Sequence, residues 1–159
     1  GSGGLRGMRL PADGKIVSLI TFAPEAAQSD LQVLTATANG YGKRTPIADY
    51  SRKNKGGQGN IAINTGERNG DLVAATLVGE TDDLMLITSG GVLIRTKVEQ
   101  IRETGRAAAG VRLINLDEGE TLVSLERVAE EAEDENPEVE NPEGNEAENA
   151  VSDTEGGEA

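Results

Sequence analysis

Short apolar runs alternate with turns rich in glycine and asparagine through the first 128 residues of this chain of 159 residues. Leucine, isoleucine and valine carry most of the runs, and such runs between turn residues favour β-strands. No convincing amphipathic helix interrupts them. Strands are expected at residues 31–37, 41–45, 60–63 and 72–78, and again at 84–88, 92–96, 111–116 and 121–128.

The same residue types recur at a spacing of 51 positions. Gly40, Arg44, Thr45 and Gly59 return as Gly91, Arg95, Thr96 and Gly110. A further internal match joins residues 4–19 to residues 110–125. A unit near 50 residues that holds several short strands indicates a bladed array rather than a helical solenoid.

We therefore expect an all-β, bladed, pinwheel- or propeller-like repeat with about two complete blades. The expected units are the end of one blade at 4–30, a blade at 31–83 and a blade at 84–128. Two blades leave exposed strand edges, so a larger array is expected around them. Residues 1–3 are interpreted as a possible cloning remnant.

The charge of the chain is divided unevenly. Its formal net charge is −13, but 13 of the 28 acidic residues and no basic residue lie in the segment 129–159. This segment is too polar to offset the cost of ordering, so a disordered acidic tail is predicted. The rest of the chain has as many basic as acidic residues, and a local cationic surface is compatible with the acidic total.

Composition also limits the chemistry. The chain has no Cys and no His, which excludes a disulfide framework, a Cys nucleophile, a Ser-His-Asp triad and a zinc ribbon. Adjacent Asp82 and Asp83 are expected in a polar turn rather than in a metal site. No apolar run approaches the length that crosses a bilayer, and no signal peptide is recognised at the start, so a cytoplasmic protein without membrane contact is expected.

The candidate functional stretch is the run 52–59, in which Arg52, Lys53 and Lys55 precede a glycine cluster. Cations beside glycines suit a polyanion, because glycine lets the backbone approach phosphate oxygens closely. No Gly-Lys-Ser/Thr sequence follows, which excludes a nucleotide-binding P-loop. The alternative is a solvated surface turn, and it stays open on these residues alone.

With these motifs in place, the chain resembles the C-terminal domain of the DNA gyrase A proteins, which are type IIA topoisomerases, and this resemblance implies that the two blades belong to a larger, six-bladed β-pinwheel. The resemblance covers nearly all of residues 5–128. It rests on the segment 39–46 (Asn-Gly-Tyr-Gly-Lys-Arg-Thr-Pro), on 56–59, on 86–91, on 95–96 and on the Gly-Val-Arg repeat at 110–112. In that family a box of Gln, two cations, two glycines, a cation and a glycine wraps DNA. Here Lys55, Gly56, Gly57 and Gly59 match the box, whereas Lys53 replaces Gln, Asn54 replaces a cation and Gln58 replaces a cation.

The resemblance implies phosphate contacts but neither catalytic nor metal residues in this chain. Lys15 and Arg68 are placed away from the expected DNA-binding rim, and Tyr41 and Tyr50 are interpreted as packing residues. The candidate DNA-binding residues are Lys43, Arg44, Arg52, Lys53, Lys55, Gly56, Gly57, Gly59, Arg95, Arg102 and Arg106.

The function implied is a DNA-binding and DNA-wrapping module. It would present a duplex segment for ATP-dependent strand passage and negative supercoiling, with gyrase B and a second gyrase A protein as partners. No cofactor is expected in this chain, and ATP and Mg²⁺ would act in the holoenzyme. The acidic tail would modulate wrapping. Alternatives are the equivalent domain of topoisomerase IV and a protein-interaction propeller without nucleic-acid binding, whereas an enzyme in its own right is the class least favoured.

Overall fold

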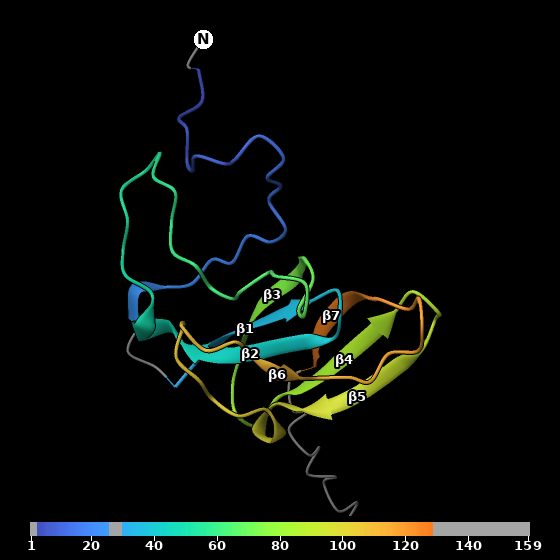
Figure 1. The fold of residues 1–159 in the computed structure, drawn as a ribbon. Coiled ribbons are helices and arrows are strands. Elements are labelled where there is room, and N and C mark those ends of the chain that lie inside the picture. The colour runs from blue at the N-terminus through green and yellow to red at the C-terminus, as the bar shows by residue number, and fades with distance from the viewer. Residues whose placement is uncertain (1–2, 26–29, 129–159) are drawn as a thin grey trace, which may run out of the picture.

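The computed structural model describes residues 3–25 and 30–128, which form two antiparallel β-sheets side by side (Figure 1). The larger sheet has the strand order β3-β1-β2-β6, from β3 (Leu72–Val78), β1 (Gln32–Thr37), β2 (Tyr41–Pro46) and β6 (Val111–Arg112). The smaller sheet has the order β5-β4-β7, from β5 (Leu93–Lys97), β4 (Asp83–Thr88) and β7 (Leu122–Val128). The all-β prediction is confirmed, and the predicted acidic tail lies outside the described residues.

The sequence repeat is also a structural repeat. Leu34 of β1 lies opposite Arg44 of β2, and 51 residues later Met85 of β4 lies opposite Arg95 of β5. The register shifts at Ala36/Thr37 between β1 and β3 and at the equivalent Ile87/Thr88 between β4 and β7. A short 3₁₀ turn follows each second strand, η2 (Ile47–Asp49) after β2 and η3 (Val98–Gln100) after β5.

Glycine is required at the tight turns that join the paired strands. Gly40, between β1 and β2, and Gly91, between β4 and β5, both have φ of +81°. This left-handed conformation is strained for residues that carry a Cβ. The two turns have the same backbone geometry, and each requires a glycine at the same position. This requirement explains why glycine recurs at a spacing of 51 residues.

The hydrophobic core joins the two sheets. Its buried members are aliphatic and come from both repeat units, and β3 of the larger sheet lies against β7 of the smaller one. The core therefore holds the two sheets together without aromatic side chains. Its buried residues are Leu34, Ala36, Val78, Leu84, Leu86, Val98, Ile101, Ile114, Leu122 and Leu125.

One strand crosses from the second unit to the first. Val111 and Arg112 of β6 follow β5 in the chain, but they pair with Gly42 and Tyr41 of β2. The larger sheet thus extends across the expected unit boundary at 83/84. The predicted strand at 111–116 is shortened to two residues, and beyond them the Leu113 and Ile114 N–H groups both donate to the Gly40 carbonyl instead of continuing the ladder.

The strand predicted at residues 60–63 is absent. Its repeat equivalent is β6, which is a strand because it pairs with the preceding unit. Among residues 3–25 no strand lies in the equivalent position to pair with 60–63, and Ile61 is 76% exposed. The prediction failed because this strand depends on a neighbour, whereas strands 31–37 and 72–78 pair within their own unit.

Candidate nucleic-acid interface

The loop between η2 and β3 carries the cations that the sequence indicated. Arg52, Lys53 and Lys55 are exposed, and neither lysine has an ion-pair partner within the described part of the chain. Gly56 and Gly59 have φ of +79° and +84°, so the loop turns sharply just after the cations. The three side chains therefore project from a backbone whose course is set by glycine.

The N-terminal segment lies beside this loop, and both rise from the same side of the sheets (Figure 1). The Gly56 N–H donates to the Gly7 carbonyl at 2.9 Å, and the Arg9 N–H donates to the Gly57 carbonyl at 2.9 Å. The Gly56 N–H is thus occupied by protein, although the sequence favoured glycine N–H groups as phosphate donors. The contact also places exposed Arg6 and Arg9 near the loop.

Arg6 and Arg9 were missed by the sequence analysis. The internal match aligns Arg6 with Arg112, and this signal could have marked it as a repeated cation. Together with the loop cations they form what we call the loop surface. Its members are Arg6, Arg9, Arg52, Lys53 and Lys55.

The lysine of β2 is not available to a ligand. Lys43 was expected among the DNA contacts, but it is 1% exposed. Its Nζ donates to the carbonyls of Gly105, Arg106 and Ala108, at 3.2 Å to Gly105 and 2.9 Å to Ala108. Burial and the nearby Arg106 charge lower the pKa of Lys43, while the three carbonyls favour the protonated amine. Lys43 fastens the loop after η3 onto β2.

Arg44 is buried in the same way, with 5% of its surface exposed. Its Nε donates to the Ile101 carbonyl, and its Nη1 donates to Gln32 Oε1 at 2.9 Å. Nη2 lies 3.8 Å from the Glu80 carboxylate. The expectation that Lys43 and Arg44 contact phosphate is therefore corrected, because the loop 98–110 of the next unit covers both side chains.

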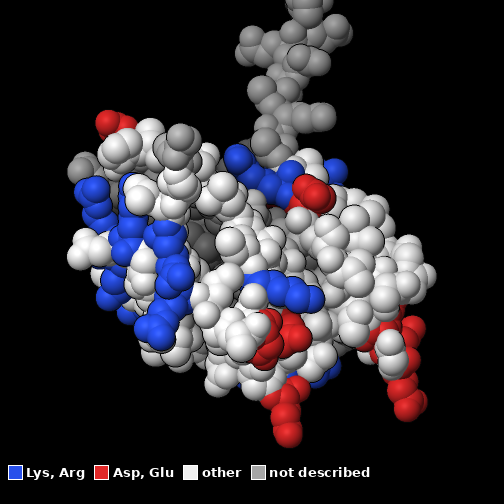
Figure 2. Space-filling view, turned by 90° about the horizontal axis from the view of Figure 1, so that it is seen from above, with Lys and Arg blue, Asp and Glu red and all other residues white. Residues whose placement is uncertain are grey.

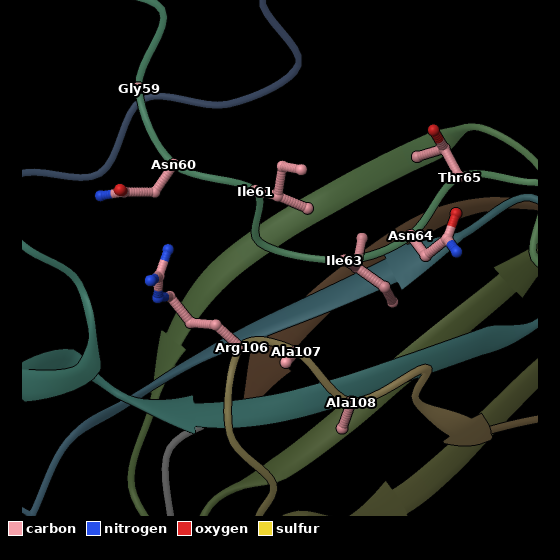
Figure 3. A pocket seen from close by; sticks show the side chains of 9 residues that line it. All are labelled: Gly59, Asn60, Ile61, Ile63, Asn64, Thr65, Arg106, Ala107 and Ala108. Carbon is pink, nitrogen blue, oxygen red and sulfur yellow. The ribbon is translucent and has the colours of Figure 1, made fainter.

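Arg106 faces the segment that follows the glycine cluster of the loop, across a hollow. This hollow has a volume of about 820 Å³ and separates the segment 59–65 from the segment 106–108 (Figure 3). The Arg106 side chain extends from one wall toward Asn60 on the other. The fold thus brings Arg106 near the glycine end of the loop, which neighbouring positions in sequence could not indicate. The lining residues are Gly59, Asn60, Ile61, Ile63, Asn64, Thr65, Arg106, Ala107 and Ala108.

Arg95 and Arg102 belong to the second unit. Arg95 is exposed on β5, and its Nε lies 2.5 Å from the Asp83 carboxylate, which partly neutralises it. Arg102 is exposed just after η3. Although these residues repeat the register of the first unit, none of the contacts found among the described residues joins them to the loop surface.

Charge is unevenly distributed on the face that carries the loop. Figure 2 shows this face from above, with Lys and Arg gathered on one side and Asp and Glu mostly on the other. The loop surface draws five cations from the segments 3–12 and 50–66, which contain no acidic residue. A cationic surface therefore exists on a chain whose total charge is negative.

The two adjacent carboxylates at the start of β4, Asp82 just before the strand and Asp83 as its first residue, are explained by ion pairs. Asp82 Oδ2 accepts from the Gly79 N–H at 2.7 Å and from Arg127 Nε at 2.6 Å, and Asp83 pairs with Arg95. Within residues 3–25 and 30–128 no group of three or more His, Cys, Asp or Glu residues could hold a metal ion. Over the same ranges, no helix has the length and apolar character needed to cross a membrane.

Two repeated antiparallel sheets, joined by an exchanged strand and bearing an exposed cationic loop, define a bladed β-propeller type of domain. The sequence model of the family described as "DNA gyrase C-terminal domain, beta-propeller" matches residues 1–23, 32–78 and 82–129. The chain belongs to this family, and the predicted resemblance is confirmed.

Individual relatives agree with this assignment. The chain is 95% identical over 131 residues to the DNA gyrase A protein of Neisseria gonorrhoeae, which covers 82% of this chain and 14% of the relative. It is 46% identical over 132 residues to the DNA gyrase A protein of Escherichia coli, covering 83% of this chain and 14% of the relative. The chain thus spans about a seventh of the length of these relatives.

Solved structures show the same fold. The structure of a DNA gyrase A C-terminal domain matches with a TM-score of 0.57 and 29% identity, over 60% of this chain and 33% of that one. The C-terminal domain of DNA topoisomerase IV matches with a TM-score of 0.66 and 22% identity, over 77% of this chain and 37% of that one. The bladed architecture predicted from the repeat is therefore confirmed.

Proposed function

We propose that this chain binds duplex DNA without sequence preference, as part of a DNA-wrapping domain of gyrase A. The observation that carries the proposal is the loop surface, where five exposed cations meet in segments that contain no carboxylate. Cations of this kind contact phosphates, and phosphate contacts supply most of the affinity in non-specific binding. Arg95, Arg102 and Arg106 add contacts from the second unit.

In the complete enzyme, the bound segment would be presented for ATP-dependent strand passage and negative supercoiling. The partners would be gyrase B and a second gyrase A protein, with ATP and Mg²⁺ acting in that holoenzyme rather than in this chain, in the bacterial cytoplasm at the nucleoid. The 95% identity to a gyrase A protein favours gyrase over topoisomerase IV. No recognition helix is found among the described elements, which supports reading of shape and charge rather than base edges.

The test is a salt series with a mixed-sequence duplex. Neutralising about five phosphates at the loop surface gives a slope of log affinity against log salt of about −4.5. We expect this slope by fluorescence anisotropy, together with equal affinity for duplexes of unrelated sequence. A slope near zero would contradict phosphate binding and favour a protein-interaction propeller, and a strong preference for one sequence would contradict recognition by charge and shape.

We further propose that the acidic segment 129–159 competes with DNA for the loop surface. Its 13 carboxylates belong to the same chain as the cations. The segment is therefore present near the loop surface at an effective concentration of order millimolar. Removing the segment after Val128 should tighten duplex binding at low salt, and the gain should vanish as salt screens the attraction over about 8 Å. The measurement compares the truncated and complete chains in one salt series. Identical curves at low salt would assign the segment to solubility alone.

A further inference from the structure

A second group of cations surrounds Tyr41 at the start of β2. The Arg68 Cζ lies 4.4 Å from the centroid of the Tyr41 ring, and the Arg112 Cζ lies 5.3 Å from it. Arg112 Nη2 also donates to the Tyr41 hydroxyl at 2.7 Å. Both arginines are exposed, so two guanidinium groups converge on one ring at the protein surface.

The backbone on both sides of this cluster is fixed by buried contacts. Asn69 is 3% exposed, and its Nδ2 donates to the Asn64 carbonyl at 2.7 Å and to the Ala109 carbonyl at 2.9 Å. This residue therefore ties the turn that carries Arg68 to the segment that leads into Arg112. Asn39 Nδ2 adds a bond of 3.2 Å to the Arg68 carbonyl, while Arg112 lies opposite Tyr41 in the β2–β6 register.

The charge of the two arginines is not neutralised by protein. Neither has an ion pair with a carboxylate among the described residues. Hydrogen bonding by Arg112 and by Arg68, with a smaller contribution from their charges, lowers the pKa of Tyr41. Arg112 uses two of its donors on the Tyr41 and Asn115 oxygens, and both guanidinium groups are exposed with donors left for a ligand.

A packing role explains this arrangement poorly. Stacking on an exposed ring stabilises the fold only weakly, and two cations on one ring repel each other. An anion held between them would remove the repulsion. Guanidinium groups match the oxygens of a phosphate, to which they can donate two parallel hydrogen bonds.

We propose that Arg68 and Arg112, held in place by Tyr41, form a second phosphate-binding site for the duplex, separate from the loop surface. This proposal rests on the proposed function. Tyr41 begins β2, whereas Arg52 comes six residues after the end of β2, beyond η2, so the two sites lie toward different ends of a strand about 17 Å long. A duplex rises about 3.4 Å per base pair, so β2 is as long as about five base pairs, and one duplex is long enough to extend past both ends. Arg68, which the sequence analysis placed away from the rim, is thereby assigned to DNA contact.

The first test removes both charges. Arg68→Gln with Arg112→Gln should weaken binding of a mixed-sequence duplex about tenfold in low salt and make the salt slope shallower by about 2. The matched control is Lys15→Gln with Lys97→Gln, which removes two exposed cations outside both sites. If the two pairs have equal effects while the wild-type chain binds, the second site is wrong and the proposed function stands. If the wild-type chain does not bind duplex, both are wrong.

The second test follows Tyr41 itself. The chain has two tyrosines, so NMR of ¹³C-labelled tyrosine resolves both, and Tyr41→Phe assigns the signals. Duplex bound at the arginines should move the Tyr41 pKa back up toward its ordinary value, because a phosphate offsets the field that lowers it. The arginine double variant should show no such change on adding duplex. The site would be overturned if the variant bound duplex more weakly while duplex left the Tyr41 pKa of the wild type unchanged. That result would mean that the two arginines affect binding only through the net charge of the protein.

Free phosphate separates a duplex site from a general anion site. Inorganic phosphate should shift the Tyr41 signal only at concentrations far above those of the duplex, because it lacks the contacts at the loop surface. An equal response to inorganic phosphate and to duplex at the same phosphate concentration would assign the arginines to free phosphate instead. Arg68→Lys with Arg112→Lys keeps the charge but loses the planar stack, so binding between that of the wild type and the glutamine variant is expected.

Discussion

Lys53→Glu combined with Lys55→Glu is expected to weaken duplex binding by roughly a hundredfold at low salt, the largest loss among the DNA-binding variants. Each lysine is exposed and unpaired within the described residues, so reversal removes two phosphate contacts and adds two repulsive charges. Folding should change by less than about half a kcal/mol, because exposed charges contribute little to stability. Anisotropy titration with a mixed-sequence duplex measures the loss.

The matched control is Lys15→Glu with Lys97→Glu. Both lysines are exposed, and the change in net charge is the same, but neither belongs to the loop surface or to the arginine pair. We expect the control to weaken binding much less than the loop variant. Equal losses would show that only the total charge matters and that the loop has no special position in the interface.

Lys43→Met is expected to have the largest effect on stability, although the sequence motif predicts a DNA contact for this residue. The amine of Lys43 is buried between β2 and the loop that covers it. The change removes the donor to the carbonyls of Gly105, Arg106 and Ala108 in that loop. Loss of hydrogen bonds from a buried charged group costs about 3 kcal/mol, which lowers the melting temperature of a domain of this size by roughly 15 °C. Thermal unfolding followed by circular dichroism measures the shift.

Duplex binding provides the complementary measurement for Lys43. At a temperature where the variant is folded, the salt slope should equal that of the wild type, because the amine contacts carbonyls rather than phosphate. Lys97→Met, at an exposed lysine, should leave the melting temperature nearly unchanged. If Lys43→Met left the melting temperature unchanged and made the salt slope shallower, Lys43 would be a DNA contact after all and not a structural residue.

The β2 region shows what a local sequence pattern can predict and what it cannot. The motif 39–46 correctly indicated a turn and a strand, because turn geometry at Gly40 and the apolar pattern around it are local properties. The same motif gave no sign that Lys43 and Arg44 are covered. Their cover comes from residues 57 or more positions later in the chain.

The equivalent positions in the second unit make the same point. Ile94 stands 51 residues after Lys43 and is 36% exposed, and Arg95 is exposed where Arg44 is buried. The sequence register treats these pairs as equivalent. The difference arises because β2 is covered by β6 and the loop 98–110, whereas no described segment covers the outer edge of β5.

The sequence by itself determined the strands that pair within one unit, the 51-residue repeat, the family and the cationic loop at 52–55, since each depends on neighbouring residues or on a fixed spacing. Only the tertiary structure decided which cations are free. It buried Lys43 and Arg44, placed Arg6 and Arg9 beside the loop, and joined Arg68 to Arg112 across 44 positions of sequence. The physical reason is that exposure and electrostatic pairing depend on which distant segments meet in space: the loop 98–110 covers β2, the N-terminal segment contacts residues 56–57, and β6 pairs with β2.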